Sequence, residues 1–177
     1  MNWTTLMFDQ LSARELYLIM RARSAVFVVE AARVHLDADG LDEGALHVFA
    51  HEDMTRAMPI CAYGRIRPGE TAYQDVVIDK MLTSPAHRRD GMADALFDHL
   101  LRVIDARWPR HRVSALAPLA QRARYERFGF RRARERGVER DTLDVAFVRG
   151  GLWDVAEPVG PRYMSGEIYD GGPFEAR

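Results

Sequence analysis

A strand, a loop of small residues and a long amphipathic helix follow one another between residues 76 and 108, and this succession constrains the fold most. The apolar run 76–85 (VVIDKMLTSP) predicts a buried strand that ends at Pro85. Apolar residues then recur at helical spacing from Met92 to Ile104, until Trp108 and Pro109 end the helix. A strand is predicted at 112–117, so this part of the chain predicts a β-α-β unit.

The flanking segments continue the alternation of strands and helices. Ser12 and Glu15 have the spacing of a capping box, which predicts a helix that continues to Phe27 and loosens near its valine-rich end. A short helix is predicted from Pro118, in its first turn, to Gly129, at its exit. Further strands are predicted at 3–8, 46–52, 60–66 and 142–148. The order predicts an α/β domain with helices on both faces of a sheet.

Composition excludes several classes of protein. The chain has 177 residues, of which 47% are hydrophobic, and this suits one compact domain. Its 25 Lys and Arg residues nearly balance its 26 Asp and Glu residues, so we expect neither nucleic acid nor a membrane as partner. The start of the chain has no leader-like pattern and no apolar run approaches the roughly 20 residues of a membrane span, so a cytoplasmic location is expected. Cys61, the single cysteine, has no C-x-x-C partner, so a core position and no metal site are expected.

The loop before the long helix has the composition of an anion site. A strand, a tight loop and a helix start leave backbone N–H groups unpaired at the positive end of the helix dipole. Gly91 and Ala93 allow a phosphate to approach the backbone, and Arg88 and Arg89 add positive charge. The alternative is an ordinary solvent-exposed helix start that happens to carry two arginines.

The wider context of this loop resembles the GNAT superfamily of acyl-CoA-dependent N-acyltransferases. The hallmark of that superfamily, (Q/R)-x-x-G-x-(G/A) at the pyrophosphate loop, falls on Arg88, Gly91 and Ala93. The segments RARSAVFVVE, DADGLD and YERFGF, with His47 opening a strand, resemble the ElaA-like branch. The resemblance implies a GNAT fold with a mixed central sheet over residues 1–149. Residues 150–177 form a Gly-, Pro- and aromatic-rich extension to which it does not apply.

The resemblance implies direct transfer of an acetyl group from acetyl-CoA to a primary amine of a small molecule or peptide, without a metal. The strand before the loop is expected to splay from its neighbour, so that its backbone amides bind the pantetheine arm and the thioester carbonyl. The expected coenzyme-binding residues are Met81, Leu82, Thr83, Arg88, Arg89, Asp90, Gly91, Met92 and Ala93. Tyr125 matches the family's proton donor to the departing thiolate. The alternative for Tyr125 is a core aromatic residue beside Phe128 and Phe130.

The general base is left open, with Glu30 and His47 as the main candidates and Asp75 and Asp79, which flank the apolar strand, as weaker ones. Glu30, at the end of the first helical region, is a candidate to remove or relay the amine proton, but it also suits a solvated helix end. His47 has an ordinary pKa near 6.5, which suits a base, but a histidine at a strand start more often has a structural role. The acidic loop that contains Asp37, Asp39 and Asp42 is expected to be solvated, with attraction of a cationic amine as the alternative.

Two rival functions remain. Acyl-homoserine-lactone synthases share the fold but use S-adenosylmethionine, and this chain lacks the tryptophan expected between Glu30 and the acidic loop. A non-catalytic acyl-CoA-binding module is the second rival, because the chain departs from the branch pattern at Lys80, Pro118 and Asp144, around the acceptor side. The amine acceptor and a possible homodimer are not determined by the sequence.

Overall fold

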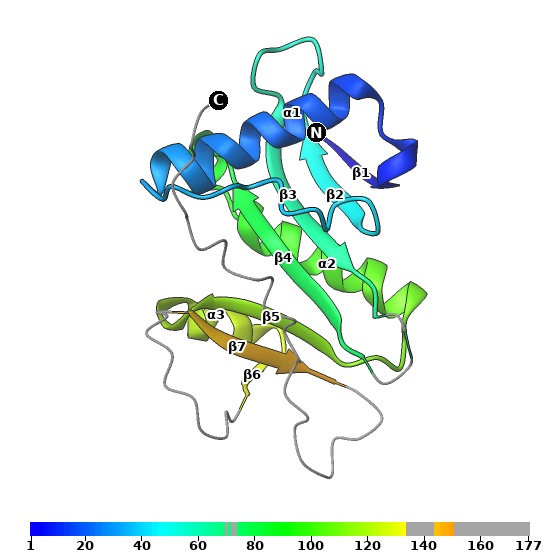
Figure 1. Cartoon of the computed structure of the whole chain (residues 1–177). Coiled ribbons are helices and arrows are strands. Elements are labelled where there is room, and N and C mark those ends of the chain that lie inside the picture. The colour runs from blue at the N-terminus through cyan, green and yellow to red at the C-terminus, as the bar shows by residue number, and fades with distance from the viewer. Residues whose placement is uncertain (70, 72–73, 134–143, 151–177) are drawn as a thin grey trace, which may run out of the picture.

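The fold is built on one mixed sheet with helices on both faces (Figure 1). The computed structural model describes residues 1–69, 71, 74–133 and 144–150. The strands are β1 (Asn2–Met7), β2 (Leu46–His51), β3 (Ile60–Arg67), β4 (Val76–Thr83), β5 (Val113–Pro118), β6 (Arg131–Arg132) and β7 (Asp144–Arg149). They are ordered β1-β2-β3-β4-β5-β7-β6, and only β4 and β5 pair in parallel.

In the part of the chain that the structure describes, three α-helices and four short helical segments of other types connect the strands. The α-helices are α1 (Ala13–Arg23), α2 (Met92–Arg107) and α3 (Arg122–Arg127). The short segments are η1 (Phe8–Gln10), the π-helical η2 (Ser24–Glu30), η3 (Pro85–His87) and η4 (Leu119–Gln121). In the described residues, no helix has both the length and the apolar character needed to cross a membrane.

The two sheet faces carry separate hydrophobic clusters. Leu96, Phe97, Leu100 and Ile104 of α2 pack with one face of the central strands. At the closest approach, a Cβ added to Gly64 of β3 would lie 2.9 Å from Leu100 Cδ1, so this glycine admits α2 to the sheet. Leu18, Ile19 and Ala22 of α1 pack with Phe49 and Tyr63 on the opposite face. The predicted α/β class, with helices on both faces, is confirmed.

The first helix begins where the sequence predicts, and its helical conformation extends past the predicted Phe27 to Glu30. The Glu15 amide donates to Ser12 Oγ at 3.2 Å, and the Ser12 amide donates to Glu15 Oε2 at 2.8 Å, which completes the capping box. The regular helix ends at Arg23, and the valine-containing segment continues as the π-helical η2. This change of helix type is the predicted loosening.

Strand β4 separates from β5 halfway along its length. The two strands pair only between Val76–Ile78 and 113–115, although β4 continues to Thr83 and β5 to Pro118. Beyond the paired part, β4 carries a bulge against β3, where Lys80 has φ 50°. The divergence of β4 and β5 is visible in Figure 1 and matches the splay that was expected.

The predicted start of the short helix is wrong. Pro118 has ψ 138°, is the last residue of β5 and pairs with Asp144 of β7, so the helical conformation begins after it. A proline is tolerated at a strand end because its missing N–H removes no interior ladder bond. Gly129, with φ 80°, leaves α3 as predicted. The strand predicted at 142–148 is found at Asp144–Arg149, and 142–143 and 151–177 lie outside the described residues.

Candidate functional site

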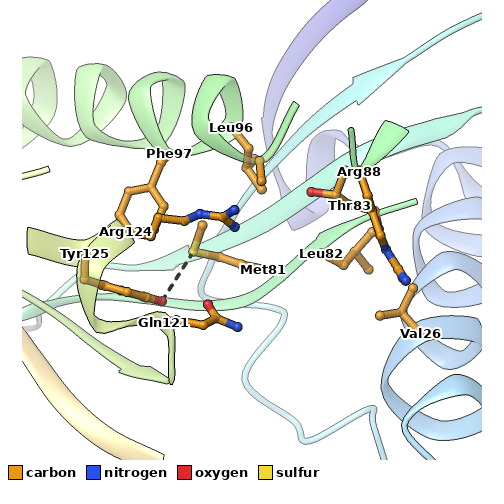
Figure 2. A pocket seen from close by; sticks show the side chains of 11 residues that line it. Val26, Met81, Leu82, Thr83, Arg88, Leu96, Phe97, Gln121, Arg124 and Tyr125 are labelled. Carbon is orange, nitrogen blue, oxygen red and sulfur yellow. Dashed lines mark hydrogen bonds between the residues drawn. The ribbon is translucent and has the colours of Figure 1, made fainter. Parts of the chain in front are cut away.

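A pocket of about 310 Å³ lies beside the unpaired half of β4. Met81, Leu82 and Thr83 of β4 line it, and Val26 of η2 and Arg88 lie at one side. Gln121, Arg124 and Tyr125 of η4 and α3 line the opposite side, and Ala93, Leu96 and Phe97 of α2 complete the lining (Figure 2). Figure 2 shows Met81 between Tyr125 and the Arg88 side of the pocket. The splay therefore creates a site that extends from the start of α2 to α3.

The helix start at this pocket has free hydrogen-bond donors. Gly91 is the N-cap of α2, with φ 80° and no side-chain capping bond. The first amides of the helix to find acceptors are those of Asp94 and Ala95, which donate to Gly91 O at 3.1 and 3.0 Å. Within the described ranges, no acceptor is found for the backbone amides of residues 88–93. Such a cluster of donors, at the positive end of a helix dipole, is suited to an anion.

Arg88 connects this loop to two other elements. Its guanidinium forms a two-point ion pair with Glu30 of η2, at 2.6 Å to Oε1 and 2.7 Å to Oε2, and its Nε donates to Thr83 O at 3.2 Å. The hydrogen bond from Arg88 lowers the pKa of Glu30. Both side chains are more than 40% exposed, so a ligand anion can compete with Glu30 for Arg88.

The other loop residues differ in their positions. Arg89, Asp90 and Gly91 are exposed and do not line the pocket. Met92 is buried, with 7% of its surface exposed, and belongs to the core. For these four residues, any contact with a ligand in the pocket would therefore come from the backbone of the loop or from rearranged side chains.

Tyr125 combines a buried ring with a hydroxyl group at the pocket. The ring stacks on Phe147 at 4.6 Å between centroids and meets Phe97 edge-on at 4.9 Å. The hydroxyl lies 4.0 Å from Met81 Sδ. Core packing thus fixes the ring and directs the phenol toward β4, so the core position raised as the alternative is confirmed and the proton-donor role stays a prediction.

His47 lies away from the pocket. It is fully buried, with Nδ1 at 2.9 Å from the Tyr63 hydroxyl and Nε2 at 3.0 Å from Asp42 O. Burial lowers its pKa below the ordinary value. The structure therefore separates His47 from Tyr125 and Arg88 and gives it two structural hydrogen bonds.

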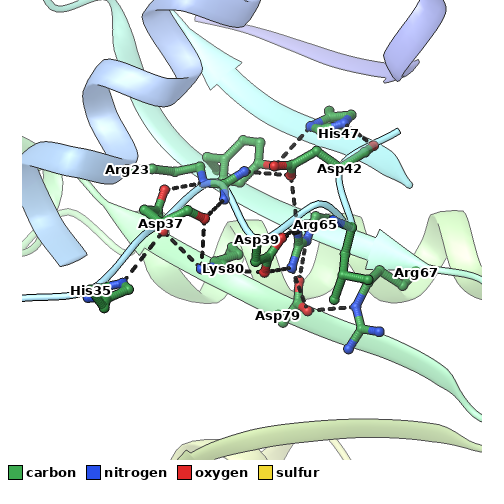
Figure 3. Close-up of polar contacts among 12 residues, drawn as sticks. Arg23, His35, Asp37, Asp39, Asp42, His47, Arg65, Arg67, Asp79 and Lys80 are labelled. Atoms are coloured by element: carbon green, nitrogen blue, oxygen red, sulfur yellow. Dashed lines mark hydrogen bonds and ion pairs between the residues drawn. The ribbon is translucent and has the colours of Figure 1, made fainter. Parts of the chain in front are cut away.

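The expectation of a solvated acidic loop is wrong. Asp37 and Asp42 are 5% and 8% exposed, and both bind Arg23, at 2.8 and 2.6 Å. Asp42 also pairs with the buried Arg65 at 2.9 Å, and Asp39 pairs with Arg65 at 2.7 Å. Burial opposes ionisation of Asp39, but the hydrogen bonds from Arg65 and the Leu41 amide, together with the charges of Arg65 and Lys80, outweigh it and hold its pKa well below the ordinary range. We name this group, together with Asp79 and Lys80, the buried ion-pair network (Figure 3).

The network reaches the bulge of β4. Lys80 Nζ lies 2.9 Å from Asp37 Oδ1, and Asp79 Oδ1 accepts from Arg65 Nε at 2.7 Å. The ion pairs thus hold Asp79 and Lys80 in place immediately before Met81 of β4. Sequence reasoning missed Arg23 and Arg65, although each interrupts an apolar pattern, in α1 and β3 respectively.

Comparison with known proteins identifies a family. A model of the acetyltransferase (GNAT) domain matches residues 24–147. A UPF0039 protein of Synechocystis sp. is 30% identical over 131 residues, which cover 73% of this chain and 82% of that protein. Protein ElaA of Escherichia coli is 29% identical over 131 residues, covering 73% of this chain and 83% of ElaA.

Solved structures agree in fold. The crystal structure of Escherichia coli ElaA has a TM-score of 0.74 and 27% identity, covering 84% of this chain and 98% of ElaA. An acyl-CoA N-acyltransferase from Pseudomonas aeruginosa has a TM-score of 0.75 and 28% identity, covering 84% and 99%. A predicted acetyltransferase with acetyl-CoA from Clostridium acetobutylicum, at 0.59 and 18%, covers 80% and 96% and shows the fold alone. The chain belongs to the GNAT acetyltransferase family, in its ElaA-like branch.

Proposed function

We propose that this protein is an acetyl-CoA-dependent N-acetyltransferase that transfers the acetyl group directly to a primary amine of a small molecule or peptide. The observation that carries the proposal is one continuous pocket that contains Arg88 at one side and Tyr125 at the other, along the unpaired half of β4. A coenzyme thioester requires donors for a diphosphate, an edge for an extended arm and an acid for a thiolate. The pocket offers candidates for all three.

The coenzyme would lie along the loop and the strand edge. Amides of residues 88–93 would bind the diphosphate, aided by Arg88 and Arg89, and backbone groups of Met81–Thr83 would bind the pantetheine arm and the thioester carbonyl. The support is the set of loop amides without an acceptor in the described residues and the absence of a β5 partner beyond Ile78.

The reaction itself needs no covalent enzyme intermediate. A neutral amine attacks the thioester carbonyl, and the tetrahedral intermediate expels the coenzyme thiolate, forming the amide. The Tyr125 hydroxyl is proposed to protonate the thiolate, and the amine loses one proton to a base or to water. A thiol has a pKa near 8.5 and a phenol near 10, so donation is uphill by only about 2 kcal/mol.

Neither Glu30 nor His47 lines the pocket, but Glu30 is the better placed as a base because it contacts Arg88, which does. While Arg88 holds it, the pKa of Glu30 is lowered and the carboxylate is a weak base. A diphosphate that takes over Arg88 would remove the hydrogen bond that lowers this pKa. Coenzyme binding would thereby strengthen Glu30 as a proton acceptor.

A thiol-release screen tests the proposed activity. Acetyl-CoA is incubated with the protein and a panel of amines and peptides, and free thiol is measured against reactions without acceptor. The proposal predicts acceptor-dependent release. Coenzyme binding with no release across the panel would contradict it and favour the non-catalytic acyl-CoA-binding module.

The Tyr125→Phe variant tests the proposed acid. Turnover should fall by about 10²-fold or more, which is typical for loss of a general acid, while coenzyme affinity stays close to wild type because the ring packing is kept. Tyr17→Phe, at an exposed tyrosine of α1, is the matched control. Unchanged kcat in Tyr125→Phe would remove the residue from the mechanism.

A further inference from the structure

Three ligand-type side chains converge where β2 ends, β3 begins and η3 follows β4. Glu52 follows β2, Cys61 lies in β3 and His87 ends η3, and their ligand atoms all lie within 4.8 Å of one another. Because the three residues are separated in the sequence and include only one cysteine, the C-x-x-C criterion does not detect them. Hydrogen bonding of the Ser84 amide to Cys61 O, at 2.8 Å, holds η3 against β3 and brings them together.

The histidine is oriented as a metal ligand would be. Its Nδ1 lies 3.3 Å from Ser84 Oγ, and its Nε2 faces Glu52 Oε1 at 3.7 Å. In metal-binding histidines, one ring nitrogen usually forms a hydrogen bond to a neighbouring group while the other binds the metal. Glu52 Oε2 is occupied by Arg56, which leaves Oε1 for the cluster.

We propose that Glu52, Cys61 and His87 form a binding site for a zinc-like divalent cation, with water in the fourth position. One thiolate, one imidazole and one carboxylate are ligands that zinc accepts in tetrahedral sites. Around such a centre, ligand atoms lie roughly 3.4–3.6 Å apart, from metal–ligand distances of about 2.0–2.3 Å. The 3.7 Å between His87 Nε2 and Glu52 Oε1 is close to this range, and the other separations, at most 4.8 Å, require shifts of up to about 1.4 Å.

Burial separates the two ends of the site. Cys61 is 2% exposed, whereas the side chains of His87 and Glu52 are 18% and 37% exposed. The thiolate would therefore lie at the closed end, and a cation would enter from the solvent side past the carboxylate, where the water ligand also fits.

Binding exchanges a proton for the metal. Burial raises the pKa of the Cys61 thiol, so the metal-free protein carries the S–H form, which makes a nucleophilic role unsuitable. When the cation binds, the S–H bond breaks, an S–metal bond forms and one proton leaves to solvent. No change of oxidation state is involved.

Cobalt(II) titration of the tag-free, full-length protein tests the site, because a cobalt–thiolate bond absorbs in the near ultraviolet and a tetrahedral centre absorbs in the visible. We expect both bands to saturate at one equivalent, zinc to displace them, and zinc to raise the thermal midpoint. Cys61→Ser should lose the thiolate band and His87→Gln should weaken binding at least tenfold. His35→Gln, at an exposed histidine, is the control and should titrate as wild type.

The opposite results would overturn the site. No thiolate band with excess cobalt, or a band of unchanged strength in both His87→Gln and Glu52→Gln, would do so. These two variants decide the matter even if Cys61→Ser fails to fold, because neither position is fully buried. Acetyl transfer is not measured in any arm, so the outcome is independent of the proposed function.

Discussion

The buried ion-pair network and the loop before α2 use charge in opposite ways. Arg23 and Arg65 are fully buried, and each binds at least two aspartates, of which Asp37 and Asp42 are themselves buried. Arg88 is exposed, and the backbone amides of residues 88–93 have no acceptor in the described residues. The ion pairs of the network hold β4 in place, whereas the backbone amides of the loop remain available to a ligand. The two regions meet on β4, on either side of Met81.

The comparison predicts its largest effect on stability at the network. Arg65→Met leaves Asp39, Asp42 and Asp79 without their shared partner, and should lower the free energy of unfolding by about 3–5 kcal/mol, the usual cost of leaving buried charges unpaired. Chemical denaturation measures it. Arg67→Met is the matched control, because Arg67 binds the same Asp79 from a more exposed position and should cost about 1 kcal/mol or less. Equal losses of unfolding free energy in the two variants would contradict the larger contribution expected of the buried arginine.

At the loop, Arg88→Gln should act on binding instead of stability. Coenzyme A affinity should fall roughly tenfold, as expected for loss of a charge-assisted phosphate contact in a partly exposed site. The free energy of unfolding should change little, since the Arg88–Glu30 pair is exposed. Isothermal titration calorimetry measures the coenzyme A affinity, and chemical denaturation measures the free energy of unfolding. A variant with a lower free energy of unfolding but normal coenzyme A affinity would contradict a binding role for Arg88.

A smaller effect of opposite sign is expected for Glu30→Gln. Removing the carboxylate frees Arg88 from its competing partner, so coenzyme A should bind a few-fold more tightly. Glu43→Gln, in the acidic loop, changes the net charge equally at an exposed position and should leave the affinity unchanged. Tighter binding in both variants would indicate a general charge effect and not competition for Arg88.

The smallest effect concerns the pH dependence of stability. The pKa of His47 is lowered by burial, so below its ordinary value of 6.5 the unfolded chain takes up a proton that the folded protein excludes. Stability should therefore rise with pH up to about 6.5, by at most about 1.4 kcal/mol per pH unit for this group. His47→Gln should flatten the slope, measured by denaturation at several pH values. An unchanged slope would show that His47 is protonated in the folded protein.

How far the sequence predicts this molecule depends on whether a feature is local. The β-α-β unit, the capping box at Ser12 and the glycine exit of α3 follow from nearby residues and are confirmed. The buried network was missed because its partners come from α1, the acidic loop and two strands, and only tertiary packing removes water from Asp37. The end of β5 was misplaced because Pro118 is compatible with either a strand end or a helix start, and pairing with β7 decided it.

Residue-specific hydrogen exchange with and without coenzyme A tests the central claim most directly. If the diphosphate binds the amides before α2, exchange at residues 88–93 should slow markedly on binding, while amides of the acidic loop around Asp42 keep their rates. Coenzyme A that binds with full occupancy and leaves exchange at 88–93 unchanged would contradict the account.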